Sequence, residues 1–238
     1  GGGSDLMFPH HENEIAQSEA ATGSTFAKVW MHNGPLRIGD EKMSKSLDNF
    51  LTVREVLASY KPEIVRYLLV SSHYRSPINY SASSLGQSAK AVERFYHCLK
   101  DLNLADSKTL TNSRFEKAFR RAMDDDFNTP EALSVLFEIV SEIHRIKGED
   151  QALANQLGAL LVRLGGSLGL LQADPAVFLQ CAVGADVDRA EIDRLVNERV
   201  AARADENWQR ADEIREQLSD LNVVIEDGLE GSTWRIEG

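Results

Sequence analysis

The sequence predicts a mainly α-helical protein that ends in a small α+β domain. Between residues 52 and 171, apolar residues recur at helical spacing and are interrupted by sequences typical of helix starts. Beyond residue 187, two charged amphipathic stretches precede two short runs rich in β-branched residues. That second pattern indicates a separate helix–helix–hairpin unit.

The composition is that of an ordinary globular protein. Of the 238 residues, 42% are apolar and 26% are charged. No run approaches the roughly 18 apolar residues that span a bilayer, so we expect no membrane partner. Cys98 and Cys181 lie far apart in no metal-type spacing, which favours a reducing cytoplasm. The net charge of −11 argues only weakly against a nucleic-acid partner, because binding depends on local patches.

The first fifty residues are expected to hold one helix and two short strands. Pro9 opens the helix and Gly23 ends it. The range 26–32 alternates well enough for a strand, and Leu36-Arg37-Ile38 is a second short strand.

The middle of the chain is expected to be a helical bundle. Residues 52–55 and 113–116 have the form of capping boxes, and Thr129-Pro130-Glu131 begins a further helix. The expected helices cover the ranges 63–70, 85–102, 115–124, 130–147 and 150–171. Short connections between the last three are typical of an antiparallel bundle.

The last part of the chain is expected to form its own domain after a linker. The range 173–187 is rich in Ala, Asp and Pro and is interpreted as that linker. Helices over 188–203 and 205–219 follow. The runs 223–225 and 233–236 flank a turn and are predicted to pair as a hairpin.

The run Lys42-Met43-Ser44-Lys45-Ser46 is the most informative candidate site. Lysine ammonium groups are flexible point charges suited to phosphate oxygens, and serine hydroxyls add donors. Such a loop can neutralise the charge that shifts during phosphoryl or adenylyl transfer. A solvated basic loop is the alternative for the pentapeptide taken alone.

His10 and Glu14 are candidate metal ligands. At positions i and i+4 of the expected helix they project from one face, whereas His11 is displaced by about 100°. The alternative is a helix N-terminus with polar groups, where carboxylates favour the helix dipole. A four-coordinate zinc site needs two more ligands, and neither Cys98 nor Cys181 is plausibly placed to supply them.

Three further groups have weaker signals. Asp5 follows three glycines, which let backbone approach a nucleotide closely, so it is either a ribose ligand or a turn residue. The acidic run 124–126 is interpreted as a helix end and turn rather than a metal site. His32 and His73 have no obvious partner in the sequence.

Taken together, these residues resemble cysteinyl-tRNA synthetases, a family of class I aminoacyl-tRNA synthetases. The resemblance covers essentially the whole chain. It rests on GGGSDLMFPHHENE at 1–14, EKMSKS at 41–46, VRYL at 65–68, DDDFNTP at 124–130 and GSTWR at 231–235. The lysine motif alone would indicate only class I, and the HHENE context favours the cysteine enzymes.

The resemblance implies a cysteine–tRNA ligase that activates cysteine with ATP and transfers it to the 3′ end of tRNA-Cys, acting as a monomer. By resemblance, His10 and Glu14 are two ligands of a Zn²⁺ ion that binds the substrate thiolate. Lys42 and Lys45 are the implied catalytic residues. The implied ATP-binding residues are Lys42, Met43, Ser44, Lys45, Ser46 and Asp5.

The resemblance also implies a domain order. Residues 1–50 would end a Rossmann-like α/β catalytic domain, 51–110 would be a stem-contact region and the start of the bundle, 111–172 the bundle, and 188–238 an anticodon-recognition domain. The family's HIGH-type ATP motif, most of its nucleotide-binding sheet and two cysteine zinc ligands would precede Gly1. We therefore expect a C-terminal half that does not aminoacylate tRNA by itself.

Two other functions stay open. A related ligase joins cysteine to an amino-sugar and shares the zinc and lysine motifs, but it needs no anticodon domain, so the unit at 188–238 disfavours it. The other is a non-catalytic tRNA-binding fragment made of the bundle and the terminal domain. The intact lysine motif favours descent from a working enzyme.

Overall fold

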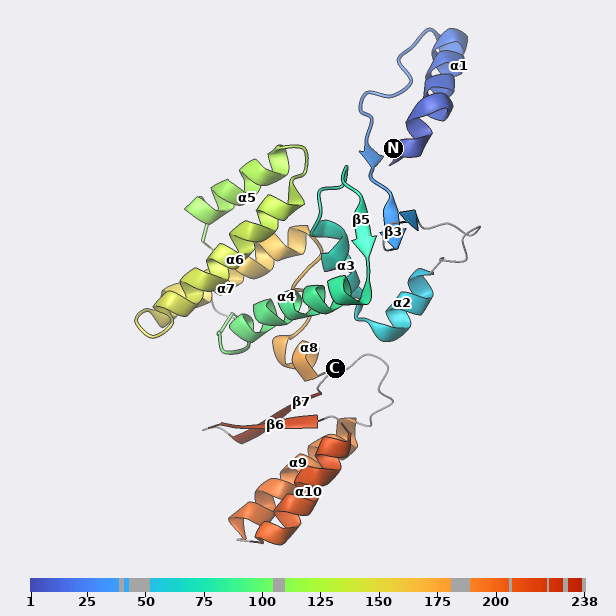
Figure 1. Cartoon of the computed structure of the whole chain (residues 1–238). Coiled ribbons are helices and arrows are strands. Elements are labelled where there is room, and N and C mark those ends of the chain that lie inside the picture. The colour runs from blue at the N-terminus through green and yellow to red at the C-terminus, as the bar shows by residue number, and fades with distance from the viewer. Residues whose placement is uncertain are drawn as a thin grey trace. The chain divides into compact units, whose positions relative to one another are not determined.

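The computed structural model describes residues 1–38, 41–42, 52–104, 110–180, 189–205, 207–221, 223–228 and 231–236 (Figure 1). Most of these residues are helical, which confirms the mainly α fold. The chain divides into two compact units, one of residues 1–57 with 62–172 and one of residues 58–61 with 173–238. Within the described ranges, every helix is too short or too polar to cross a bilayer.

The N-terminal segment contains one helix and a minimal parallel sheet. A π-type turn at Met7–His11 leads into α1 (Glu12–Thr22), which Gly23 ends in the left-handed region at φ 66°, as predicted. β1 (Gly2–Gly3) pairs in parallel with β2 (His32–Asn33).

The strand expected at 26–32 is wrong, because only its last residue belongs to a strand. β1 is two residues long and pairs only with residues 32 and 33, so the preceding residues have no partner strand. Phe26 and Val29 are 45% and 75% exposed, and the alternation therefore marks no buried face.

A three-stranded sheet in the order β4-β3-β5 follows. The predicted strand β3 (Leu36–Ile38) is confirmed; it pairs antiparallel with β4 (Glu41–Lys42) and parallel with β5 (Ile78–Tyr80). Because β5 comes some forty positions later in the chain, the sheet joins two distant segments.

Two short helices lie between β4 and β5, α2 (Val53–Ser59) and α3 (Pro62–Val70). The capping box before α2 is confirmed: Thr52 N–H donates to Glu55 Oε2 at 2.7 Å, and Glu55 N–H donates to Thr52 Oγ1 at 3.2 Å. The hydrogen bond from Thr52 N–H, and after it the one that the Thr52 hydroxyl donates to Glu55 Oε2 at 2.7 Å, lower the pKa of Glu55.

The bundle consists of α4 (Ala82–Lys100), α5 (Arg114–Asp124), α6 (Thr129–Ile146) and α7 (Gln151–Ser167), close to the predicted ranges. α6 packs against the other three, as Figure 1 shows. Its apolar face supplies much of the core, including the fully buried Leu136, Ile139 and Ile143.

Only half of the capping box predicted at the start of α5 forms. Ser113 Oγ accepts from Glu116 N–H at 3.2 Å, but the Glu116 carboxylate turns elsewhere. It accepts from Asn112 N–H at 2.8 Å and pairs with Arg120 at 2.9 Å and Arg163 at 3.1 Å. These contacts, the Asn112 bond first, lower the pKa of Glu116. Because Arg163 lies on α7, this carboxylate ties α5 to α7.

The second unit has its own core. α9 (Arg189–Ala204) and α10 (Trp208–Asp220) form a hairpin beside the antiparallel pair β6 (Val223–Gly228) and β7 (Gly231–Ile236), as predicted. A short helix, α8 (Pro175–Gln180), lies within the range expected to be linker. The core residues are Ile192, Leu195, Val196, Ile214, Leu218, Val223 and Trp234.

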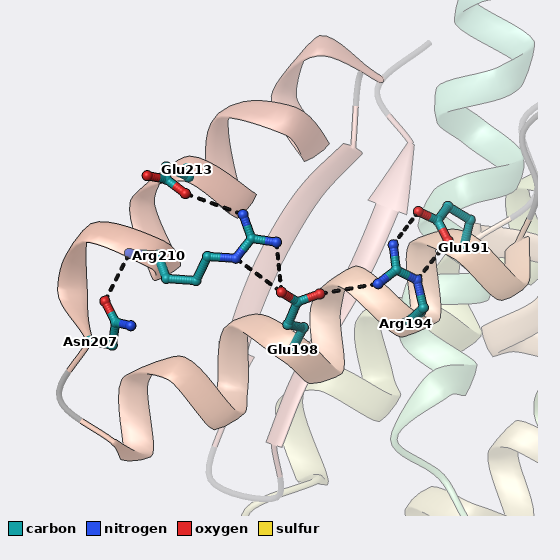
Figure 2. Close-up of polar contacts among 6 residues, drawn as sticks. All are labelled: Glu191, Arg194, Glu198, Asn207, Arg210 and Glu213. Carbon is teal, nitrogen blue, oxygen red and sulfur yellow. Dashed lines mark hydrogen bonds and ion pairs between the residues drawn. The ribbon is translucent and has the colours of Figure 1, made fainter.

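A chain of ion pairs fastens α9 to α10 (Figure 2). Glu198 accepts from Arg194 on its own helix at 3.2 Å and from Arg210 of α10 at 2.6 Å. Arg194 also holds Glu191, and Arg210 also holds Glu213. Arg194 and Arg210 are therefore both paired with carboxylates.

Candidate functional site

The lysine motif begins where the small sheet ends. Lys42 is the last residue of β4, and its backbone pairs with Arg37 of β3. The other four residues of the motif, 43–46 and thus Lys45, lie outside the described residues. The pairing of β4 with β3 therefore fixes the backbone of Lys42, the first residue of the motif.

Asp5 lies in a 3₁₀ turn (Ser4–Leu6) directly after β1. A Cβ atom on Gly3 would lie only 2.4 Å from Asp5 Oδ1. A side chain at position 3 would therefore require the Asp5 carboxylate to move, a relation within the glycine run that the sequence did not reveal.

His10 and Glu14 are exposed; Glu14 lies in the first turn of α1, whereas His10 lies in the π-type turn that precedes the helix, so α1 begins later than Pro9 predicted. Imidazole and carboxylate are both zinc donors, but they supply only half of a four-ligand site. Nowhere in the described ranges do three His, Cys, Asp or Glu side chains gather closely enough to hold a metal. Cys98 is buried in α4, and this burial raises the pKa of its thiol to about 11, which disfavours the thiolate that binds metals. Cys181 lies outside the described residues.

His11, which follows His10 in the sequence, forms a pair with His32 that sequence reasoning missed. His11 Nδ1 and His32 Nε2 are 2.8 Å apart, so one ring donates a hydrogen bond to the other. Both rings lie near Trp30, with centroids 5.0 Å and 6.0 Å away. The pairing of β1 with β2 brings His32 into reach, and only a prediction of that pairing could have found the contact.

The Asp126 carboxylate joins the turn between α5 and α6 to the loop before β5. Arg75 donates to it twice, from Nε to Oδ2 at 2.6 Å and from Nη2 to Oδ1 at 3.1 Å. The Tyr74 hydroxyl donates to Oδ1 at 2.7 Å. These hydrogen bonds, that from Arg75 first, lower the pKa of Asp126 to about 2.

The interpretation of residues 124–126 as a helix end and turn is confirmed. α5 ends at Asp124, and Asn128 Oδ1 accepts from Glu131 N–H to cap α6. The partners of Asp126 are about fifty residues away in the sequence, and no local pattern announced them.

Three family models match successive parts of the chain. The class I (C) tRNA synthetase catalytic domain matches residues 1–90, and the DALR domain matches 118–172. The cysteinyl-tRNA ligase anticodon binding domain matches 189–235. Cysteine–tRNA ligases of Stutzerimonas stutzeri A1501 and Azotobacter vinelandii DJ are 56% and 55% identical over 236 residues. This chain belongs to the cysteinyl-tRNA synthetase family.

The match covers 99% of this chain but 51% of each of those relatives, so the chain spans about half the length of the curated cysteine–tRNA ligases it matches. The fold is also that of class I synthetases. A crystal structure of a ternary complex of Agrobacterium radiobacter K84 LeuRS matches 70% of this chain and 25% of its own, with a TM-score of 0.57. At 18% identity, this likeness concerns the fold alone.

Acid is expected to remove the Asp126 contact in a defined pH window. The pKa of Asp126 is about 2 in the folded chain against an ordinary 3.8, so the charged carboxylate stabilises the fold. That contribution is complete above about pH 4 and disappears as the pH falls through about 2. In urea unfolding, the stability lost in Asp126→Asn should be largest near neutral pH and vanish toward pH 2. Asp124→Asn is the matched control, and a loss independent of pH in Asp126→Asn would contradict the contact.

Proposed function

We propose that this chain acts as part of a cysteine–tRNA ligase, which uses ATP to attach cysteine to tRNA-Cys. The observation that carries this proposal is the order of the matches along the chain. The catalytic-domain model includes the lysine motif, and the anticodon-domain model coincides with the separate unit of α9, α10, β6 and β7. We expect the ligase to act as a monomer in the cytoplasm.

In the proposed reaction the cysteine carboxylate attacks the α-phosphorus of ATP, and the bond to the bridging oxygen breaks to release pyrophosphate. A hydroxyl at the 3′ end of the tRNA then attacks the cysteinyl carbonyl and releases AMP. The ammonium groups of Lys42 and Lys45 would neutralise the charge that develops on the leaving phosphates. Ser44 and Ser46 would donate hydrogen bonds to phosphate, and Asp5 would accept from a ribose hydroxyl.

Lys42→Ala and Lys45→Ala are each expected to slow cysteine-dependent ATP–pyrophosphate exchange by about 10²-fold in kcat, because each removes a charge needed mainly in the transition state. The KM for cysteine should change little. The assay is done in a ligase of full family length that contains this chain. Lys28→Ala, an exposed lysine outside the motif, is the control. Wild-type exchange in both motif variants would refute the assignment.

We also propose that His10 and Glu14 supply two of the four ligands of a Zn²⁺ ion. When bound, zinc would coordinate the thiolate of cysteine and thereby distinguish it from the hydroxyl of serine. The support is the donor chemistry and the four-residue spacing across the junction of the π-type turn and α1.

His10→Ala and Glu14→Gln should each weaken zinc binding of the full-length ligase at least about tenfold, since losing one ligand leaves an incomplete coordination shell. Competition with a chelator of known affinity measures this, with the exposed His97→Ala on α4 as control. Unchanged affinity in both ligand variants would remove these residues from the metal site.

We further propose that the terminal unit binds the anticodon region of tRNA-Cys. The family model supports this, and so does Trp208, whose side chain is 59% exposed in the first turn of α10. An exposed indole offers a face on which a nucleobase can stack. Arg194 and Arg210 are held by glutamates, so we expect stacking rather than these charges to dominate.

Trp208→Ala is expected to weaken tRNA-Cys binding about tenfold, the magnitude of one lost base–aromatic stack. Leu221→Ala, an exposed apolar residue after the same helix, is the control. Deletion of residues 189–238 should weaken binding further in a filter-binding assay. A deletion without effect would make the anticodon assignment wrong. Cysteine-dependent exchange without tRNA binding by the full-length protein would favour the amino-sugar ligase, and tRNA binding without that exchange would favour the non-catalytic RNA-binding protein.

A further inference from the structure

The turn that presents Asp126 has an unusual backbone. Asp126 and Phe127 are consecutive non-glycine residues in the left-handed region, with φ of 51° and 54°. This conformation is unfavourable for residues with side chains and persists only where surrounding contacts fix it. Phe127 is 51% exposed, so burial of its ring does not explain the turn. What the turn does is direct the Asp126 carboxylate toward Tyr74 and Arg75.

The contacts extend beyond a single ion pair. Thr129 Oγ1 donates to the carbonyl of Ser72 at 3.5 Å, and His73 Nε2 lies 3.9 Å from Asp126 Oδ2. Isolated surface ion pairs stabilise little, but a bidentate arginine within a network is the recognised exception. The α5–α6 turn therefore holds the loop at residues 71–77 through several side chains.

That loop in turn holds the small sheet. Gly34 N–H donates to the Tyr74 carbonyl at 2.8 Å, and Ile78 N–H donates to the Pro35 carbonyl at 3.0 Å. The two backbones touch directly, because a Cβ atom on Gly34 would lie 2.2 Å from the Ser76 carbonyl oxygen. Residues 34 and 35 lead into β3, and β3 pairs with β4, whose last residue is Lys42.

We infer that Asp126 is a positioning residue. Through Arg75 and Tyr74, it anchors the sheet β4-β3-β5 to the helical bundle, and the lysine motif begins at the last residue of β4 in that sheet. Every step of the connection from Asp126 to Lys42 is a hydrogen bond or a backbone contact of the first unit. Its importance for the reaction rests on the proposed function. Lysines that neutralise a transition state must be placed accurately, and small displacements lower the rate strongly.

The direct test is hydrogen exchange of the 238-residue chain with Asp126→Asn. Asparagine tolerates the left-handed region, so the backbone of the turn is kept while the charge and the bidentate contact are lost. We expect at least tenfold faster exchange of the Gly34 and Ile78 amides, and an unchanged rate for Ile139 in the core of α6. Asp124→Asn, in the same acidic run, should leave all three at wild-type rates.

A second variant guards against a general loss of structure. The exchanged pair Arg75→Asp with Asp126→Arg should recover part of the lost protection, which a merely misfolded turn would not do. Wild-type protection in Asp126→Asn, or equal acceleration of Gly34 and Ile139, would overturn the anchoring.

The catalytic consequence is read separately in the full-length ligase. Asp126→Asn should lower kcat of cysteine-dependent pyrophosphate exchange severalfold with the KM for cysteine unchanged, and Asp124→Asn should not. A wild-type kcat in Asp126→Asn would overturn the positioning role. A wild-type ligase without cysteine-dependent exchange would instead count against the proposed function, and the hydrogen-exchange result would still decide the anchoring.

Discussion

The three hydrogen bonds that the Asp126 carboxylate accepts from Tyr74 and Arg75 are the interaction on which the arrangement of the first unit depends. The sheet β4-β3-β5 has strands of only two or three residues, and so small a sheet cannot bury enough surface to be stable alone. It needs support from a rigid neighbour. The bundle provides it, because α6 packs against three other helices and its inner face is fully buried.

Because the sheet depends on it, the bundle has a structural role of its own: it supports the strand that ends at Lys42. Catalysis by lysines near phosphate requires that their backbone be held in place, and β4 alone cannot hold it. The second unit is different, because it carries its own apolar core and joins α9 to α10 through Glu198. The proposed division of labour follows from these two designs: a sheet anchored for chemistry, and an independently folded domain for RNA recognition.

The sequence predicted the features that local chemistry determines. Helix boundaries followed from caps such as Thr52 and Ser113, and Gly23 ended the first helix. The two terminal runs pair as predicted, but Asp227 and Gly228, where the turn was expected, belong to β6. Glu116 was assigned a local capping partner, yet its carboxylate turned to Arg163 on another helix. The strand predicted at 26–32 is wrong because an alternating segment needs a partner strand, and β1 pairs with only two residues.

The contacts of His11 with His32 and of Arg75 with Asp126 join residues 21 and 51 positions apart, which no local pattern can reveal. For the lysine motif, sequence and family carry the assignment, because residues 43–46 lie outside the described residues.

The anchoring of the sheet depends on one carboxylate being held by one guanidinium. The most direct measurement is a carbon-13 NMR titration of the Asp126 carboxyl group in the wild-type chain and in Arg75→Ala. The expected result is a wild-type pKa of about 2 and a clear rise toward the ordinary 3.8 when the guanidinium is removed. A wild-type pKa already near 3.8, or one that does not respond to the loss of Arg75, would contradict the anchoring of the sheet on the bundle.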